Sequence, residues 1–205
     1  MRPAAKSFRH INQALSFAAM RLQARAETRR LAQEIESARE SLCVIEETFA
    51  EIQQDHEQTI EAILQSEAQL RESITALEEA LRPMTTSATA RHLSQTRPSE
   101  LLRLPQGRDR LLKARALLTL LEDAPFSVGL HGYASKLRQC LFALEDAFRR
   151  HEAVLLARSN GLRERTRGLQ RAQRLFQRLV LQTKLLFPQD PSLLTLEENF
   201  LPRAA

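Results

Sequence analysis

Two stretches of this chain carry apolar residues at alternating spacings of four and three, which is typical of helices that bury one stripe. The first stretch runs from Leu31 to Leu81 and the second from Leu137 to Leu186. At 1.5 Å per residue, about fifty helical residues extend for about 75 Å, too far for the interior of a compact globule. Other helices must cover these stripes, so the sequence predicts an all-α, elongated helical bundle of coiled-coil-like character.

The composition favours helix in nearly every segment. The 205 residues include five glycines, no tryptophan and one tyrosine, while good helix formers such as Ala, Leu, Glu, Gln and Arg are abundant. We expect one elongated domain, 1–205. Its predicted parts are an N-terminal helix at 4–30, a long acidic helix at 31–82, a linker at 83–98, short helices at 99–123, a long basic helix at 133–187 and a docked tail at 188–205.

Two positions in this plan depend on the phase of the apolar stripes. The stripe of the N-terminal helix loses phase near residues 24–30, which predicts a bend or a change of packing partner without an outright break. Two consecutive steps of four at His56 form a stutter, which locally unwinds a left-handed supercoil. The linker is long enough for the two long helices to run either parallel or antiparallel.

Five polar residues occupy apolar phases of the long helices. We interpret them as core positions that fix helix register or partner number, or as points where the stripe meets solvent. They are His56, Glu67, His151, Arg158 and Arg165.

The two long helices differ in charge. Between Glu34 and Glu79 there are thirteen acidic and two basic side chains, whereas between Arg149 and Lys184 there are ten basic and two acidic ones. Charges that flank an apolar seam select the partner and orientation of a helix. The split therefore predicts pairing of these helices, either within one chain or between copies.

A row of arginines on the last helix is the main candidate for binding a polyanion. Its members recur at spacings of four, four, three and four, so they share one helix face and could follow a phosphate backbone. Phe176, the one aromatic residue among them, has an apolar phase, so stacking on single-stranded bases is poorly supported. The candidate residues are Arg163, Arg167, Arg171, Arg174 and Arg178, joined by Arg21, Arg25 and Arg29 of the N-terminal helix. A secondary basic cluster comprises Arg103, Arg108, Arg110, Lys113 and Arg115.

No pattern in the sequence indicates catalysis, a cofactor or a metal. A nucleophile elbow, a phosphate-binding glycine loop and a zinc-type cysteine pair are all missing, and no two histidines are three or four residues apart. The loop at 129–133 is interpreted as a helix start rather than a means of presenting His131. Cys43 and Cys140 are interpreted as buried or half-buried thiols.

These features predict a non-catalytic structural or interaction protein. It would be a helical subunit or scaffold that assembles with itself or within a larger complex. The alternative is a nucleic-acid-binding accessory subunit that uses the arginine row. No apolar run is long enough to span a bilayer, and Arg158 and Arg165 interrupt the apolar stripe that would insert into a membrane surface. We therefore expect a cytoplasmic protein.

Overall fold

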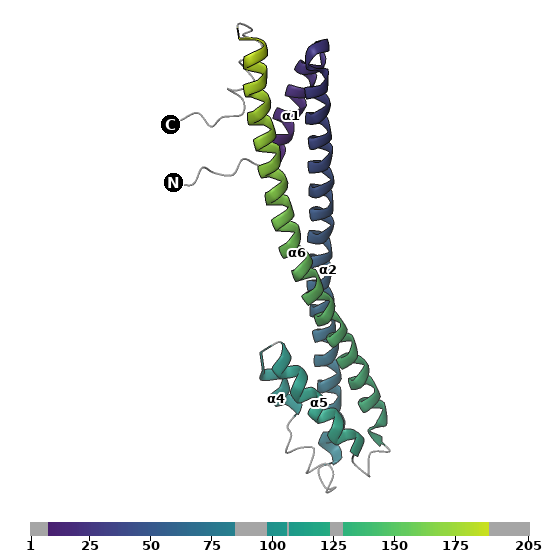
Figure 1. Cartoon of the computed structure of the whole chain (residues 1–205). Helices are drawn as coiled ribbons and strands as arrows, with labels where there is room; N and C mark the ends of the chain where they lie inside the picture. Colours follow the sequence, from purple (N-terminus) through teal and green to yellow (C-terminus); the bar gives the residue numbers. More distant parts are fainter. Residues whose placement is uncertain (1–7, 85–97, 106, 124–128, 189–205) are drawn as a thin grey trace. The chain divides into compact units, whose positions relative to one another are not determined.

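The described part of the chain is helical. The computed structural model describes residues 8–84, 98–105, 107–123 and 129–188, and none of these forms a strand. The prediction of an all-α bundle with two long helices and shorter packed ones is confirmed. Its elements are α1 (Phe8–Gln23), the 3-10 turn η1 (Ala26–Thr28), α2 (Arg29–Leu81), η2 (Arg82–Met84), α4 (Pro98–Arg103), α5 (Arg108–Asp123) and α6 (His131–Leu186) (Figure 1).

Most helix boundaries agree with the sequence prediction. The short helices separate between Arg103 and Arg108, where Gly107 adopts a φ of 128° that few residues other than glycine tolerate. Pro83 closely follows the last residue of α2. The rest of the linker and nearly all of the predicted docked tail, from residue 189 on, lie outside the described residues.

The chain divides into two compact units. Unit 1 comprises residues 1–54 and 156–205, and unit 2 comprises residues 55–155, so α2 and α6 contribute to both. The boundary on α2 falls beside His56, where the apolar spacing stutters. That the whole chain behaves as one domain stays a prediction.

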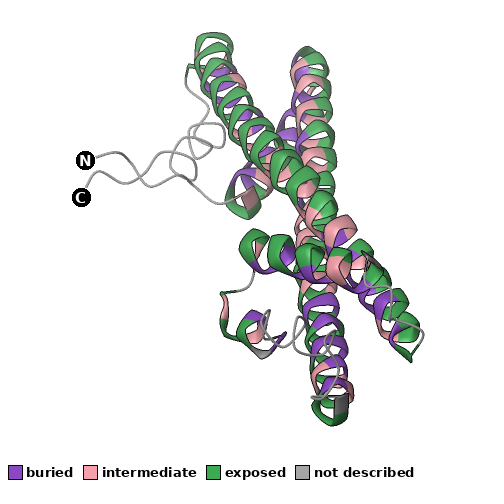
Figure 2. Cartoon of the chain, turned by 90° about the horizontal axis from the view of Figure 1, so that it is seen from below, coloured by how far each residue is buried: buried purple, intermediate pink, exposed green. Residues whose placement is uncertain are grey.

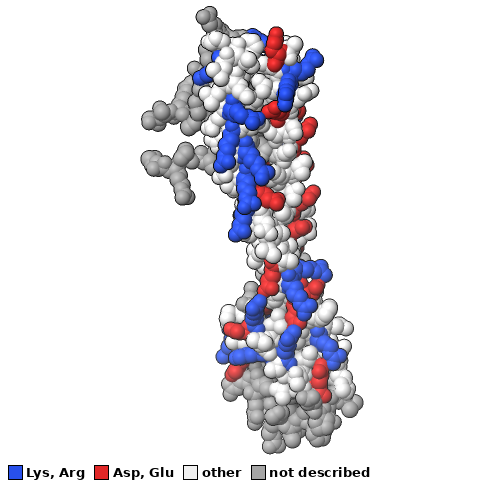
Figure 3. Space-filling view, in the orientation of Figure 1, with Lys and Arg blue, Asp and Glu red and all other residues white. Residues whose placement is uncertain are grey.

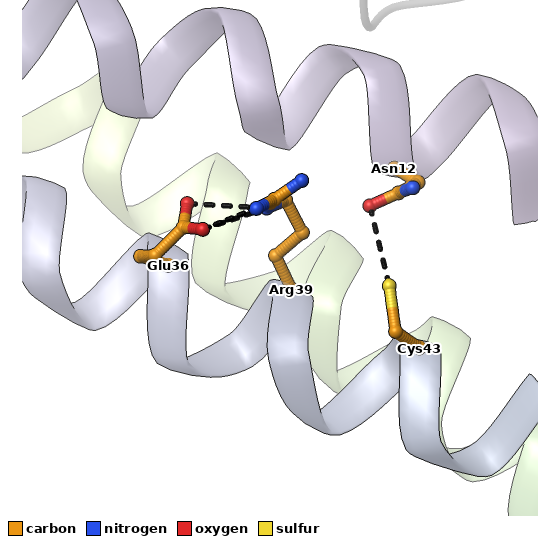
Figure 4. Close-up of polar contacts among 4 residues, drawn as sticks. All are labelled: Asn12, Glu36, Arg39 and Cys43. Carbon is orange, nitrogen blue, oxygen red and sulfur yellow. Dashed lines mark hydrogen bonds and ion pairs between the residues drawn. The ribbon is translucent and has the colours of Figure 1, made fainter.

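Between α1 and α2 the chain reverses instead of bending. Arg25 has extended backbone angles, which ends α1 before η1. The fully buried Thr28 then donates its hydroxyl proton to the carbonyl oxygen of Leu22 at 2.6 Å, satisfying one of the free carbonyls at the end of α1. Farther along, Cys43 Sγ lies 4.0 Å from Asn12 Oδ1, so α1 runs antiparallel to α2 (Figure 4). The predicted helix at 4–30 is therefore shorter at its C-terminal end.

Helix α1, the first half of α2 and the last part of α6 form the core of unit 1. In this unit α2 and α6 are antiparallel, because Glu34 pairs with Arg178 and Glu46 with Arg165. This settles the orientation that the linker length left open. The apolar core consists of Ile11, Ala14, Leu15, Ala18, Ala19, Leu22, Ala32, Ile35, Leu42, Ala172, Phe176, Leu179 and Val180 (Figure 2).

In unit 2, α4 and α5 pack with the second half of α2 and the first half of α6. The core residues include Leu70, Ile74, Leu77, Leu117, Leu121, Leu137, Cys140 and Leu144. Among the described residues of this unit, one ion pair is buried. Arg110 Nη1 of α5 donates to Glu67 Oε2 of α2 at 2.5 Å, with side-chain exposures of 4% and 2%. Arg110 also donates to the carbonyl oxygen of Leu104. Glu67 is thus a true core position, as its phase predicts.

None of the described helices contains a segment that combines the length and the apolar character needed to cross a bilayer.

Candidate functional site on the outer face of α6

The arginine row lies on the side of α6 that faces away from the core of unit 1. Ala172, Phe176 and Leu179 are buried, and at 100° per residue Arg167 and Arg174 project about 140–160° away from Ala172. All five arginines of the row are exposed. They span sixteen residues, and the first and last lie about 22 Å apart along the helix. The five arginines therefore lie on one exposed face of α6.

Among the described residues, one end of this row has an ion-pair partner. Arg178 Nη2 lies 2.9 Å from Glu34 Oε2. The half-buried Arg165, outside the row, takes Glu46 in a bidentate pair at 2.5 and 2.6 Å and stacks over the ring of Phe49. The four remaining members form no hydrogen bond or ion pair through their side chains with any described residue. These unpaired members, called the basic row below, are Arg163, Arg167, Arg171 and Arg174. Figure 3 shows basic side chains gathered along α6 in unit 1.

The three candidate arginines near the first turn have separate surroundings. Arg25 is half-buried and places its guanidinium 4.9 Å from the ring centroid of Phe187, just beyond the end of α6. Arg21 lies over Phe17 of its own helix at 5.2 Å. Arg29 is exposed, and neither Arg21 nor Arg29 has a hydrogen bond or ion pair to α6 among the described residues. These contacts do not join the three arginines to the basic row.

Three arginines of the secondary basic cluster at residues 103–115 form ion pairs within unit 2. Arg110 is buried against Glu67, Arg108 pairs with Glu152 at 2.6 Å, and Arg115 pairs with Glu145 at 2.5 Å. The reason is the packing of α5 beside α2 and α6, which brings carboxylates opposite these arginines. Three of the five positive charges are thus matched within unit 2.

An exposed acidic row on α2 was missed by the sequence analysis. Glu40, Glu47 and Glu51 are exposed and, at 100° per residue, project about 140–180° away from the buried Leu42. None of the three has a hydrogen bond or ion pair within the described part of the chain. Val44, which is 60% exposed, lies on the same face. Their spacings of seven and four were a usable signal, hidden by the many other carboxylates of α2.

Another carboxylate of α2, that of Glu36, forms an ion pair near α1. Arg39 Nε donates to both oxygens of Glu36 at 3.0 and 3.1 Å, beside the contact of Asn12 with Cys43 (Figure 4). This hydrogen bonding raises the pKa of Arg39. Glu36 therefore differs from the acidic row, since its charge already has a partner.

A histidine pair in unit 2 is the other polar cluster of note. The rings of His56 and His151 have centroids 5.2 Å apart, and Thr59 Oγ1 lies 3.1 Å from His151 Nδ1. Thr59 donates its one hydroxyl proton to the carbonyl oxygen of His56 at 2.9 Å. With that proton used, the hydroxyl oxygen accepts a hydrogen bond from the Nδ1–H of His151, an arrangement that suits a structural hydrogen bond.

The two free cysteines have different accessibilities. Cys140 is buried, and the loss of solvent raises the pKa of its thiol, whereas Cys43 is partly exposed. The interpretation of both as buried or half-buried thiols is confirmed.

We expect iodoacetamide to modify Cys43 at least tenfold faster than Cys140 at neutral pH, because the reaction needs an accessible thiolate. Mass spectrometry of tryptic peptides over time measures both rates in one sample, and urea-unfolded protein is the control. Equal rates in the folded protein would contradict the described burial of Cys140.

Comparison with known proteins does not assign this chain to a family. No protein-family model matches the chain, and no curated protein or solved structure matches it either. Within the described ranges, no three His, Cys, Asp or Glu side chains come together as a group that could hold a metal ion.

Proposed function

We propose that this chain is a non-catalytic interaction protein that docks onto an acidic protein surface through the basic row of α6. The observation that carries the proposal is the state of Arg163, Arg167, Arg171 and Arg174, which are exposed and have no carboxylate partner within the described residues. Unpaired arginines on a rigid helix can make bidentate contacts with carboxylates without reorganising the fold.

Three features favour a protein partner over a nucleic acid. Phe176 is buried, so it cannot stack on bases. Three of the five residues in the secondary basic cluster form ion pairs. Unit 1 also carries the acidic row, whose charges would repel a polyanion near that face.

We also propose a cytoplasmic location. Cys43 and Cys140 are free thiols, which accords with a reducing compartment.

Site-specific photo-crosslinking tests this proposal. Gln170 is exposed between Arg167 and Arg171 and can be replaced by a photoreactive amino acid. Gln139, exposed on α6 in unit 2, is the matched control position. In cells of the native host we expect a protein adduct from position 170 that is lost when Arg163, Arg167 and Arg174 are changed to Glu. Absence of any adduct at 170, or equal adducts at both positions, would count against the proposal.

Nucleic-acid binding remains the second candidate, because four unpaired arginines along one face also suit a phosphate backbone. Binding of duplex DNA through all four would give a slope of about −0.9 per phosphate contact, or about −3.6, in a plot of log Kobs against log salt. Fluorescence anisotropy at low salt measures this slope. Binding that is unchanged by Arg167→Glu, Arg171→Glu and Arg174→Glu would remove this candidate.

A further inference from the structure

The structure of unit 1 points to a specific occupant for the basic row. We propose that the row binds the acidic row of a second copy of this chain, with α6 of one copy lying antiparallel on α2 of the other. This inference rests on the proposed function and names its partner. The recognition chemistry is carboxylate to guanidinium, between two helix faces that are both exposed and unpaired within the described part of one chain.

The spacing of the two rows is complementary. Along α2 the carboxylates lie at Glu40, Glu47 and Glu51, so the intervals are seven and four residues. Along α6, Arg163, Arg167 and Arg174 are separated by four and seven residues. Antiparallel helices reverse the order of one row, which places Arg163 opposite Glu51, Arg167 opposite Glu47 and Arg174 opposite Glu40 in a single register.

A parallel arrangement of the two helices is less favourable because it would break an existing ion pair. It also gives matching intervals, but only by using Arg167, Arg174 and Arg178. Arg178 is already paired with Glu34 of its own chain at 2.9 Å. The antiparallel register uses only arginines of the basic row, so it forms new ion pairs without breaking an existing one.

The geometry of the two faces determines the kind of assembly. The acidic and basic rows lie on different helices, and each projects away from the core of unit 1. A contact between different patches is heterologous, so it gives either a closed ring or an open chain whose end copies each keep one row free. Since the contact consists of exposed charges, it should be weak and sensitive to salt.

Charge reversal on each side, followed by mixing, tests the inference. One variant carries Arg163→Glu, Arg167→Glu and Arg174→Glu, and the other carries Glu40→Lys, Glu47→Lys and Glu51→Lys. At roughly 50 mM salt, where screening is modest, we expect sedimentation velocity to show self-association of the wild-type chain. Each variant alone should associate at least tenfold more weakly. An equimolar mixture should recover association, because every copy then meets a complementary face.

Matched controls separate this contact from general charge effects and misfolding. Arg71→Glu, Arg82→Glu and Arg103→Glu change the same number of exposed arginines in unit 2 and should leave self-association within twofold of wild type. Circular dichroism should show unchanged helix content in every variant. Glutamine at Arg163, Arg167 and Arg174 should give a smaller loss than glutamate, which a folding defect would not.

Two outcomes would overturn the inference: a wild-type chain that stays monomeric at low salt, and a mixture that fails to recover association. A crosslink from position 170 to a different acidic protein would also overturn it, while leaving the proposed function intact. Absence of both the crosslink from position 170 and self-association would overturn this inference and the proposed function together.

Discussion

Replacing Arg110 by methionine should destabilise unit 2 by about 3–5 kcal/mol, the usual cost of breaking a buried ion pair from one side. Glu67, 2% exposed, would keep its carboxylate in the core without a cation, and the carbonyl oxygen of Leu104 would lose the arginine as a donor. Urea unfolding followed by circular dichroism measures the change. Arg103→Met, an exposed position on α4, is the control and should change stability by less than about 0.5 kcal/mol.

A double variant separates the pair from its parts. Glu67→Leu with Arg110→Met removes both charges and keeps most of the apolar volume, so it should recover much of the stability lost in the single variant. Should the single variant unfold at the wild-type urea concentration, the described burial of this ion pair would be wrong.

Phe176→Ala should cost about 3–5 kcal/mol, because truncation of a buried aromatic side chain leaves a cavity that the surrounding helices fill only in part. Phe176 is 3% exposed and lies in the core cluster of α1, α2 and α6. Leu185→Ala, on the same helix but 83% exposed, is the matched control and should lie within about 0.5 kcal/mol of wild type. Thermal unfolding of the two variants in one buffer makes the comparison.

This pair of substitutions also tests which face of α6 is turned toward the core of unit 1. If Leu185→Ala were the more damaging change, the core face of α6 would be the opposite one. The basic row would then be turned inward, and the functional proposals would lose their basis.

Helix identity and most boundaries were predictable because they depend on local pattern. The four-three spacing required long helices, and Gly107 and the prolines at 83 and 105 explain where helices end. The reversal after Gln23 was not predictable. It depends on burial of Thr28 and on its hydrogen bond to Leu22, which exist only once α1 packs on α2.

The candidate site was predictable only in outline. Spacing alone placed the arginines of α6 on one face. Which of them remain unpaired depends on the register of α6 against α2, which places Glu34 beside Arg178 and Glu46 beside Arg165. The same holds for Arg110. The sequence does not distinguish a buried arginine paired with Glu67 from an exposed one, because the pairing depends on where α5 packs.

Two glycines on the inner side of α6 have a consequence for its outer side. A Cβ at Gly161 would lie 3.1 Å from Phe49 Cδ2, and one at Gly168 would lie 2.9 Å from Ile45 Cδ1, so side chains of α2 fill the space at both positions. Each glycine weakens an isolated helix by about 1 kcal/mol relative to alanine. Both lie within or beside the stretch that holds the basic row. The regular alignment of positive charge on α6 is therefore a property that the neighbouring helix maintains, and it would be lost if α6 separated from α2.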